Sequence, residues 1–135
     1  MKAPAASGAA AAAVTFLLAG CGSSDRDQVR SKMEEFAVAV AHRDAKTICS
    51  DVFAPSLVQR FRGAGLSCQR GLHIFFTALH HPTLAVGRIT VHGSKASAVT
   101  LSGASGQPPA VRAIQLVKTS DGWRILSLAA TSTKP

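Results

Sequence analysis

Cysteines, histidines and arginines are the residues of this 135-residue chain whose types and spacing could do chemistry. A cysteine can act as a nucleophile beside a histidine base, pair in a disulfide, or carry a group that the cell attaches. Cys21 ends an alanine-rich stretch, whereas Cys49 and Cys68 lie in the more charged sequence that follows. The chemistry open to each of them therefore depends on the segment that positions it.

Cys21 follows a segment with the layout of an export signal. Lys2 gives a positive start, residues 9–19 are apolar, and small residues come directly before the cysteine. The apolar stretch is shorter than the roughly 20 residues that a transmembrane helix needs. An ordinary signal peptide, with Cys21 as an incidental thiol, is one interpretation.

The four residues Leu18-Ala19-Gly20-Cys21 favour a second interpretation, because they resemble the bacterial lipobox. The resemblance implies attachment of diacylglycerol, and of acyl chains such as palmitate, to Cys21, with cleavage before it. We therefore expect a lipoprotein signal peptide over residues 1–20, a short tether with the lipidated cysteine over 21–24 and one domain over 25–135. The domain is then expected at the extracytoplasmic face of a bacterial cell membrane, held by a lipid anchor.

Charge and composition limit the class of partner. The formal net charge of +8 permits nucleic acid, an anionic membrane surface or an acidic polymer. The basic residues are scattered singly, however, and the chain has no tyrosine on which bases could stack. We therefore expect no nucleic-acid partner.

The first half of the mature sequence predicts helices. Ser24 with Asp27 resembles a capping box, and apolar residues then recur at helical spacing (Val29, Met33, Phe36, Ala37, Val40). Asp44 can cap a second short helix, and Pro55 suits the first turn of a third. A fourth helix is expected from about Ser67 to His80, with Cys68, Leu72, Phe75, Phe76 and Leu79 on one face.

The second half predicts four strands, over residues 84–91, 95–102, 110–118 and 123–129, with tight turns after the first and third. Residues 103–109, with their glycines, serines and paired prolines, predict a longer connection. Strands in hairpin succession form an antiparallel sheet. The expected class is α+β, with N-terminal helices packed on a curved, four-stranded antiparallel sheet.

A family resemblance follows from the order of these elements and from three local patterns. These are Asp44 after the long helix, Val91-His92-Gly93-Ser94-Lys95-Ala96-Ser97-Ala98-Val99 across one hairpin, and Asp121-Gly122-Trp123-Arg124-Ile125 opening the last strand. Together they resemble the nuclear transport factor 2-like (SnoaL-like) superfamily, and best its branch of small exported bacterial lipoproteins, including the paired cysteines. The resemblance implies a cone-shaped fold with a pocket between sheet and helices.

Cys49 and Cys68 are expected to form a disulfide. They remain as an even pair once Cys21 is assigned to lipid, and disulfides persist in exported domains. The alternative, a reactive thiol with a histidine base, is disfavoured because both cysteines lie on apolar helix faces, where thiols are usually inert.

The histidines do not form an evident metal site. His80 and His81 are neighbours at a predicted helix end and point in different directions. His73 and His80 could share a helix face, but a catalytic zinc site usually needs a third ligand. His42 and His92 are expected at a helix end and a turn, and no metal or cofactor is predicted.

Arg88, Arg112 and Arg124 lie in predicted strands and could meet on one face of the sheet. Solvated cross-strand positions are the ordinary interpretation of such residues. The alternative is an anion patch, since guanidinium groups pair well with carboxylate or phosphate.

We expect a non-catalytic binding or scaffolding module rather than an enzyme. The family's isomerases use a carboxylate base with tyrosine or protonated acid donors, and this chain has no tyrosine and only Asp121 as a carboxylate after Asp51. The alternative is a pocket enzyme of isomerase or dehydratase type that uses a histidine.

The expected partners are the membrane, a small apolar ligand, and a second copy or an envelope protein on the outer sheet face. The expected pocket lining is Phe36, Phe75, Phe76, Leu79 and Trp123.

Overall fold

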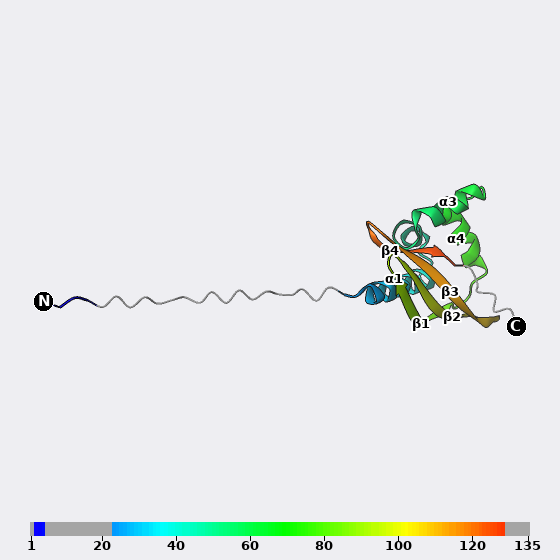
Figure 1. Ribbon diagram of the computed structural model, residues 1–135. Coiled ribbons are helices and arrows are strands. Elements are labelled where there is room, and N and C mark those ends of the chain that lie inside the picture. Colours follow the sequence, from blue (N-terminus) through cyan, green and yellow to red (C-terminus); the bar gives the residue numbers. More distant parts are fainter. Residues whose placement is uncertain (1, 5–22, 129–135) are drawn as a thin grey trace.

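The computed structural model describes residues 2–4 and 23–128 of the chain. Helical segments fill the first half of the domain and strands the second, in the predicted order (Figure 1). The elements are α1 (Asp25–Ala41), α2 (Ala45–Thr47), the π-helix η1 (Ile48–Val52), α3 (Pro55–Gly63), α4 (Cys68–Thr77), β1 (Thr83–His92), β2 (Lys95–Ala104), β3 (Gln107–Thr119) and β4 (Gly122–Ser127).

The strands form one antiparallel sheet in the order β1-β2-β3-β4, so each strand pairs with its neighbour along the chain. Gly93 lies in the tight turn of the first hairpin and Gly122 directly follows the turn of the last, with φ of 59° and 101°, which favour glycine. α1 packs across β1, β2 and β4, and η1 runs beside β4. This arrangement confirms the predicted α+β class, with helices packed on one four-stranded antiparallel sheet.

Two helix starts are capped as the sequence predicts. The Asp27 N–H donates to the Ser24 hydroxyl at 3.2 Å, and the Thr47 N–H donates to the Asp44 carboxylate at 3.0 Å. The N–H and then the hydroxyl of Thr47 hold the pKa of Asp44 below its ordinary value. Each cap satisfies an N–H that would otherwise lack a partner in the first helical turn.

The core lies between α1, the shorter helices and the inner face of the sheet. The buried residues of α1 are Val29, Met33, Phe36 and Ala39. Ala37 and Val40 of the predicted face are half-buried, and Ala39 was not predicted. Trp123 is 2% exposed and lies in this core. Among the described residues, every buried apolar residue falls between Val29 and Ile125. A chain of residues 22–135 therefore contains all of this described core and is expected to fold without the N-terminal segment.

The predicted disulfide between Cys49 and Cys68 is present and joins η1 to α4. Its Cα atoms are 6.0 Å apart, within the usual range for a disulfide. η1 is a π-helix, a rare form, because the Phe53 N–H donates to the Ile48 carbonyl five residues earlier at 2.8 Å. The bond thus fixes an irregular segment to a regular helix.

α4 ends at Thr77, before the predicted end at His80. The Thr77 hydroxyl donates to the Ile74 carbonyl at 2.7 Å, and the Ala78 N–H turns back to the Phe75 carbonyl at 3.2 Å. His81 then has a positive φ of 48°, a backbone conformation that is incompatible with a continuing α-helix. His80 and His81 therefore lie in the linker to β1.

The connection between β2 and β3 is shorter than predicted. Both strands continue to a tight turn at Ser105 and Gly106, where the sequence predicted a loop over residues 103–109. Pro108 and Pro109 lie where the register shifts, between the pairs Ser102–Ala110 and Ala104–Gln107. Such a bulge accommodates proline, because the hydrogen bonds between the two strands are already interrupted there and the missing N–H of proline is not needed.

Asp25 ties the start of α1 to the sheet and gives a pH-dependent prediction. Its Oδ1 accepts from Lys118 Nζ at 2.7 Å and from Trp123 Nε1 at 3.1 Å, and these bonds lower its pKa from the ordinary value of 3.8. A lowered pKa in the folded state contributes stability that is present above pH 3.8 and lost as the pH falls through the folded pKa. We expect Asp25→Asn to reduce stability at neutral pH, with the difference from wild type narrowing below about pH 4.

Urea unfolding at a series of pH values measures this difference. Asp121→Asn is the matched control, because the Asp121 carboxylate accepts no hydrogen bond among the described residues. A difference between wild type and Asp25→Asn that stays constant from pH 7 to about pH 3 would contradict the assignment.

Candidate functional site

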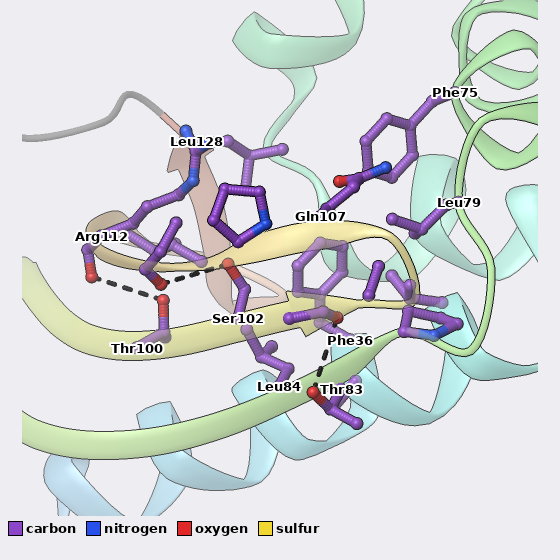
Figure 2. Close-up of a pocket in the computed structure, with 18 residues that line it drawn as sticks. Phe36, Phe75, Leu79, Thr83, Leu84, Thr100, Ser102, Gln107, Arg112 and Leu128 are labelled. Carbon is purple, nitrogen blue, oxygen red and sulfur yellow. Dashed lines mark hydrogen bonds between the residues drawn. The ribbon is translucent and has the colours of Figure 1, made fainter.

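A cavity of about 300 Å³ lies between α1, the end of α4 and the inner face of the sheet. Figure 2 shows the labelled side chains around it, with Phe36 on the helix side and Thr100 and Ser102 on the sheet. Its size is at the lower end of the roughly 300–1,000 Å³ found for small-molecule pockets. The residues that line it are Phe36, Ala37, Val40, Phe75, Leu79, Pro82, Thr83, Leu84, Thr100, Ser102, Gly103, Ala104, Gln107, Pro108, Ala110, Arg112, Ile114 and Leu128.

The space for the cavity comes from small side chains on β2. Ala96, Ala98, Thr100 and Ser102 alternate along the strand and share its inner face. Ala96 and Ala98 leave room for the core side chains of α1, and Thr100 and Ser102 lie in the cavity wall further along. This alternation is the sequence signal that could have located the cavity.

Hydroxyl groups on the inner wall bond to backbone carbonyls. Thr100 donates to the Arg112 carbonyl at 3.3 Å, and Ser102 donates to the Ala110 carbonyl at 3.3 Å (Figure 2). Thr83 donates to the Gly103 carbonyl at 3.5 Å. These bonds satisfy polar groups that would otherwise be costly beside an apolar cavity. Sequence analysis did not find these residues.

The predicted apolar lining divides into two sets. Phe36, Phe75 and Leu79 border the cavity (Figure 2), and Phe75 is half exposed at 50%. Phe76 and Trp123, in contrast, are buried in the core at 3% and 2% exposure and do not line it. Of the predicted aromatic residues, Phe36 and Phe75 therefore face the cavity, whereas Phe76 and Trp123 belong to the core.

The three strand arginines do not form the anion patch that the sequence suggested. Arg88 lies on β1 and Arg124 on β4, which are the opposite edges of the sheet. Arg124 donates to the Ser50 carbonyl at 2.7 Å on the η1 side. Arg112 alone faces the cavity. Strand order therefore separates residues that sequence spacing allowed to meet.

Arg112 is the one ionisable side chain among the described residues of the cavity lining. Figure 2 shows it running along the wall toward Leu128. It lies on the inner face of β3 with Ala110 and Ile114, the latter buried at 3%. A guanidinium in this position gives a mainly apolar cavity one fixed positive charge.

None of the five histidines is among the described residues that line the cavity, although His80 and His81 lie between the lining residues Leu79 and Pro82. His42, His73, His80, His81 and His92 are all exposed. Within residues 23–128, no three histidine, cysteine, aspartate or glutamate side chains gather closely enough to hold a metal ion.

The outer face of the sheet carries an apolar strip. Val99, Leu101 and Val111 are 38%, 50% and 63% exposed, and Leu101 pairs directly with Val111. Contact with a second copy or an envelope protein through this face stays a prediction.

Cys21 and the predicted signal segment lie outside the described residues apart from residues 2–4. Of the helices described, none has the length and hydropathy to cross a membrane.

Comparison with protein-family models and with curated protein sequences gives no match. Solved structures give several. A proposed dehydratase of the nuclear transport factor 2-like family from Streptomyces avermitilis superposes with a TM-score of 0.52 at 15% identity, covering 76% of this chain and 92% of its own. A nuclear transport factor 2-like protein of unknown function from Silicibacter pomeroyi gives 0.54 at 14% identity, covering 75% and 89%.

A protein from Kribbella flavida gives a TM-score of 0.51 at 17% identity, covering 81% of this chain and 90% of its own. These structures show that the chain has the nuclear transport factor 2-like fold, as its sequence predicted. At such identities the likeness extends to the fold alone.

Proposed function

We propose that this chain is an exported lipoprotein whose domain binds a small, largely apolar molecule without transforming it. The observation that carries the proposal is the lining of the cavity, where Arg112 is the one ionisable side chain among the described residues. A guanidinium stays protonated in proteins, so it can hold a charge but cannot act as a general base near neutral pH. The described lining offers a ligand apolar contact and one fixed charge.

The alternative is a pocket enzyme of isomerase or dehydratase type that uses a histidine. Such an enzyme needs a base within hydrogen-bonding reach of the substrate. The five exposed histidines are not in the described lining, which supports the binding function over this one. The Streptomyces protein is described as a proposed dehydratase, but at 15% identity that likeness gives no residue correspondence here.

The membrane anchor in this proposal is supported by the lipobox-like Leu18-Ala19-Gly20-Cys21. α1 begins at Asp25, so few residues separate Cys21 from the folded domain. At about 3.3 to 3.6 Å per extended residue, this link reaches on the order of 10 Å. Two or more acyl chains on one residue would hold the domain stably, whereas a single chain binds only marginally.

The cavity is separated from the start of α1, which follows the proposed anchor in the sequence. Its residues from α1 are Phe36, Ala37 and Val40, whereas the helix starts at Asp25. At about 1.5 Å per residue, they lie roughly 16 to 22 Å along the helix from its first residue.

Filling the cavity tests the binding function. Ala110 lies on the inner face of β3 in the cavity lining, so Ala110→Phe places a ring in the space that a ligand would use. We expect the affinity for octanol, a small amphiphile, to fall by about tenfold or more, since burying the chain of such a ligand contributes about 0.8 kcal/mol per methylene. Nuclear magnetic resonance titration of residues 22–135 measures the affinity and identifies the amides that respond.

The matched control is Ala85→Phe, which adds the same ring on the outer face of β1 opposite Leu101. It should leave octanol binding unchanged. Equal loss of octanol binding in the two variants, or octanol shifts confined to amides outside the cavity, would contradict the proposed binding site.

A further inference from the structure

The guanidinium of Arg112 is the most distinctive polar group of the cavity. It has no hydrogen-bond or ion-pair partner among the described residues, although the backbone carbonyl of the same residue accepts from Thr100. Three other arginines are held by backbone carbonyls, namely Arg30, Arg43 and Arg124. Arg112 therefore presents its N–H groups to whatever enters the cavity.

The other donors of the lining are already engaged. The hydroxyls of Thr83, Thr100 and Ser102 each donate to a backbone carbonyl, and the side-chain amide of Gln107 donates to the Ala78 carbonyl at 3.0 Å. Arg112 is thus the one lining side chain whose donors all lack a described partner. Because Arg112 is exposed, a ligand that displaces water from its N–H groups has to supply an acceptor in exchange, and an anionic acceptor suits a guanidinium best.

The remaining walls specify the rest of the ligand. Phe36, Leu79, Leu84 and Ile114 surround the interior with apolar surface. The volume of about 300 Å³ equals about ten water-sized groups, at about 30 Å³ for each water in the liquid. A molecule with one short chain or ring and one head group fits this space, whereas a lipid with two long acyl chains is too large.

We infer that the cavity selects single-chain amphiphiles that carry one anionic head, with the head paired to Arg112 and the chain against the apolar walls. This inference rests on the proposed binding function and names its ligand class. A carboxylate is the head best matched, because the planar guanidinium can donate two parallel hydrogen bonds to its two oxygens. Arg112 is in this account a specificity-determining residue.

Octanoate and octanol test the selection of an anionic head, because they have alkyl chains of similar length and differ in the charge of the head. Each is titrated at pH 7 into residues 22–135 while amide shifts are followed by nuclear magnetic resonance. We expect octanoate to bind about fivefold or more tightly than octanol, a gain typical of a charge-assisted bond that is partly exposed to water. Octyl phosphate, tested in parallel, distinguishes a carboxylate site from a general anion site.

Arg112→Met removes the charge and keeps an unbranched side chain. It should lower octanoate affinity far more than octanol affinity, so that the preference of the wild type for octanoate disappears in the variant. Arg88→Met, which removes an arginine of β1 that does not line the cavity, should change neither affinity. The dispersion of the amide spectrum shows in each case that the variant is folded.

Two outcomes would overturn parts of the account separately. If octanoate and octanol bind equally, or if Arg112→Met weakens both alike, selection of an anionic head fails while binding in the cavity stands. If neither probe shifts the cavity amides of the wild type, the proposed binding function itself fails. Tighter binding of octyl phosphate than of octanoate would replace the carboxylate with phosphate as the preferred head.

Discussion

Substitution of Cys21 by alanine in the full chain is expected to abolish both acylation and conversion of the precursor to the shorter mature form. The reason is chemical, since the thiol of Cys21 is the atom to which the lipobox resemblance assigns diacylglycerol. Without that thioether, the chain lacks the acyl groups whose burial would hold it at the membrane at about 0.8 kcal/mol per methylene. Metabolic labelling with an alkyne analogue of palmitate, followed by gel electrophoresis, measures both changes at once.

Ser24→Ala is the matched control for this experiment. It alters a residue close to Cys21 and removes the cap of α1, but it leaves the Leu18-Ala19-Gly20-Cys21 motif intact. Labelling and processing should both persist. A wild-type chain that takes up no label, or a Cys21→Ala chain labelled as strongly as wild type, would refute the lipid anchor.

Removal of the Cys49–Cys68 disulfide is expected to have the largest effect on stability. The two residues are 19 apart in sequence, so the bond closes a loop for which the chain-entropy account gives about 3 kcal/mol of stabilisation. This is a large share of the roughly 5–15 kcal/mol that stabilises a typical domain. Urea unfolding of the double variant Cys49→Ala/Cys68→Ala, with the wild type alongside, measures the loss.

A reducing agent supplies the control for the disulfide. Dithiothreitol should lower the unfolding midpoint of the wild type toward that of the double variant and leave the double variant unaffected. A double variant as stable as the wild type would contradict the stabilising role. Two thiols that react freely in the unreduced native protein would contradict the bond itself.

The sequence predicted those parts of the fold that short-range chemistry decides. Ser24 and Asp44 cap their helices because their side chains need only reach an N–H three residues on. Pro55 begins α3 because an N–H in the first turn of a helix has no intrahelical acceptor, so its absence in proline costs no hydrogen bond. The strand order followed from successive hairpins, in which each strand pairs with the next.

The prediction of the fold is wrong where a tertiary contact overrides the local sequence pattern. The paired prolines predicted a loop, but the Ser105 N–H donates to the His80 carbonyl and Gln107 donates to Ala78, which holds the β2–β3 turn against the linker after α4. Pro108 and Pro109 are accommodated there by a bulge. A single sequence does not reveal such a contact.

The candidate site was predictable only in part. Phe36 and Leu79 could be assigned to an apolar face from helical spacing, and both border the cavity. The lining role of Thr100 and Ser102 depends on the register between β2 and β3, which fixes the side of the sheet they face. The placement of Arg112 apart from Arg88 depends on strand order in the same way.

Native mass spectrometry of the mature protein released from its own cell envelope tests the central claim most directly. The account predicts a chain that begins at Cys21, carries the covalent mass of a diacylglyceryl group, and retains a non-covalent molecule whose fragments identify a single-chain amphiphile with an anionic head. A chain that begins elsewhere or lacks the lipid mass would contradict the anchor. A lipidated chain that retains no small molecule, or one with two acyl chains, would contradict the function assigned to the cavity.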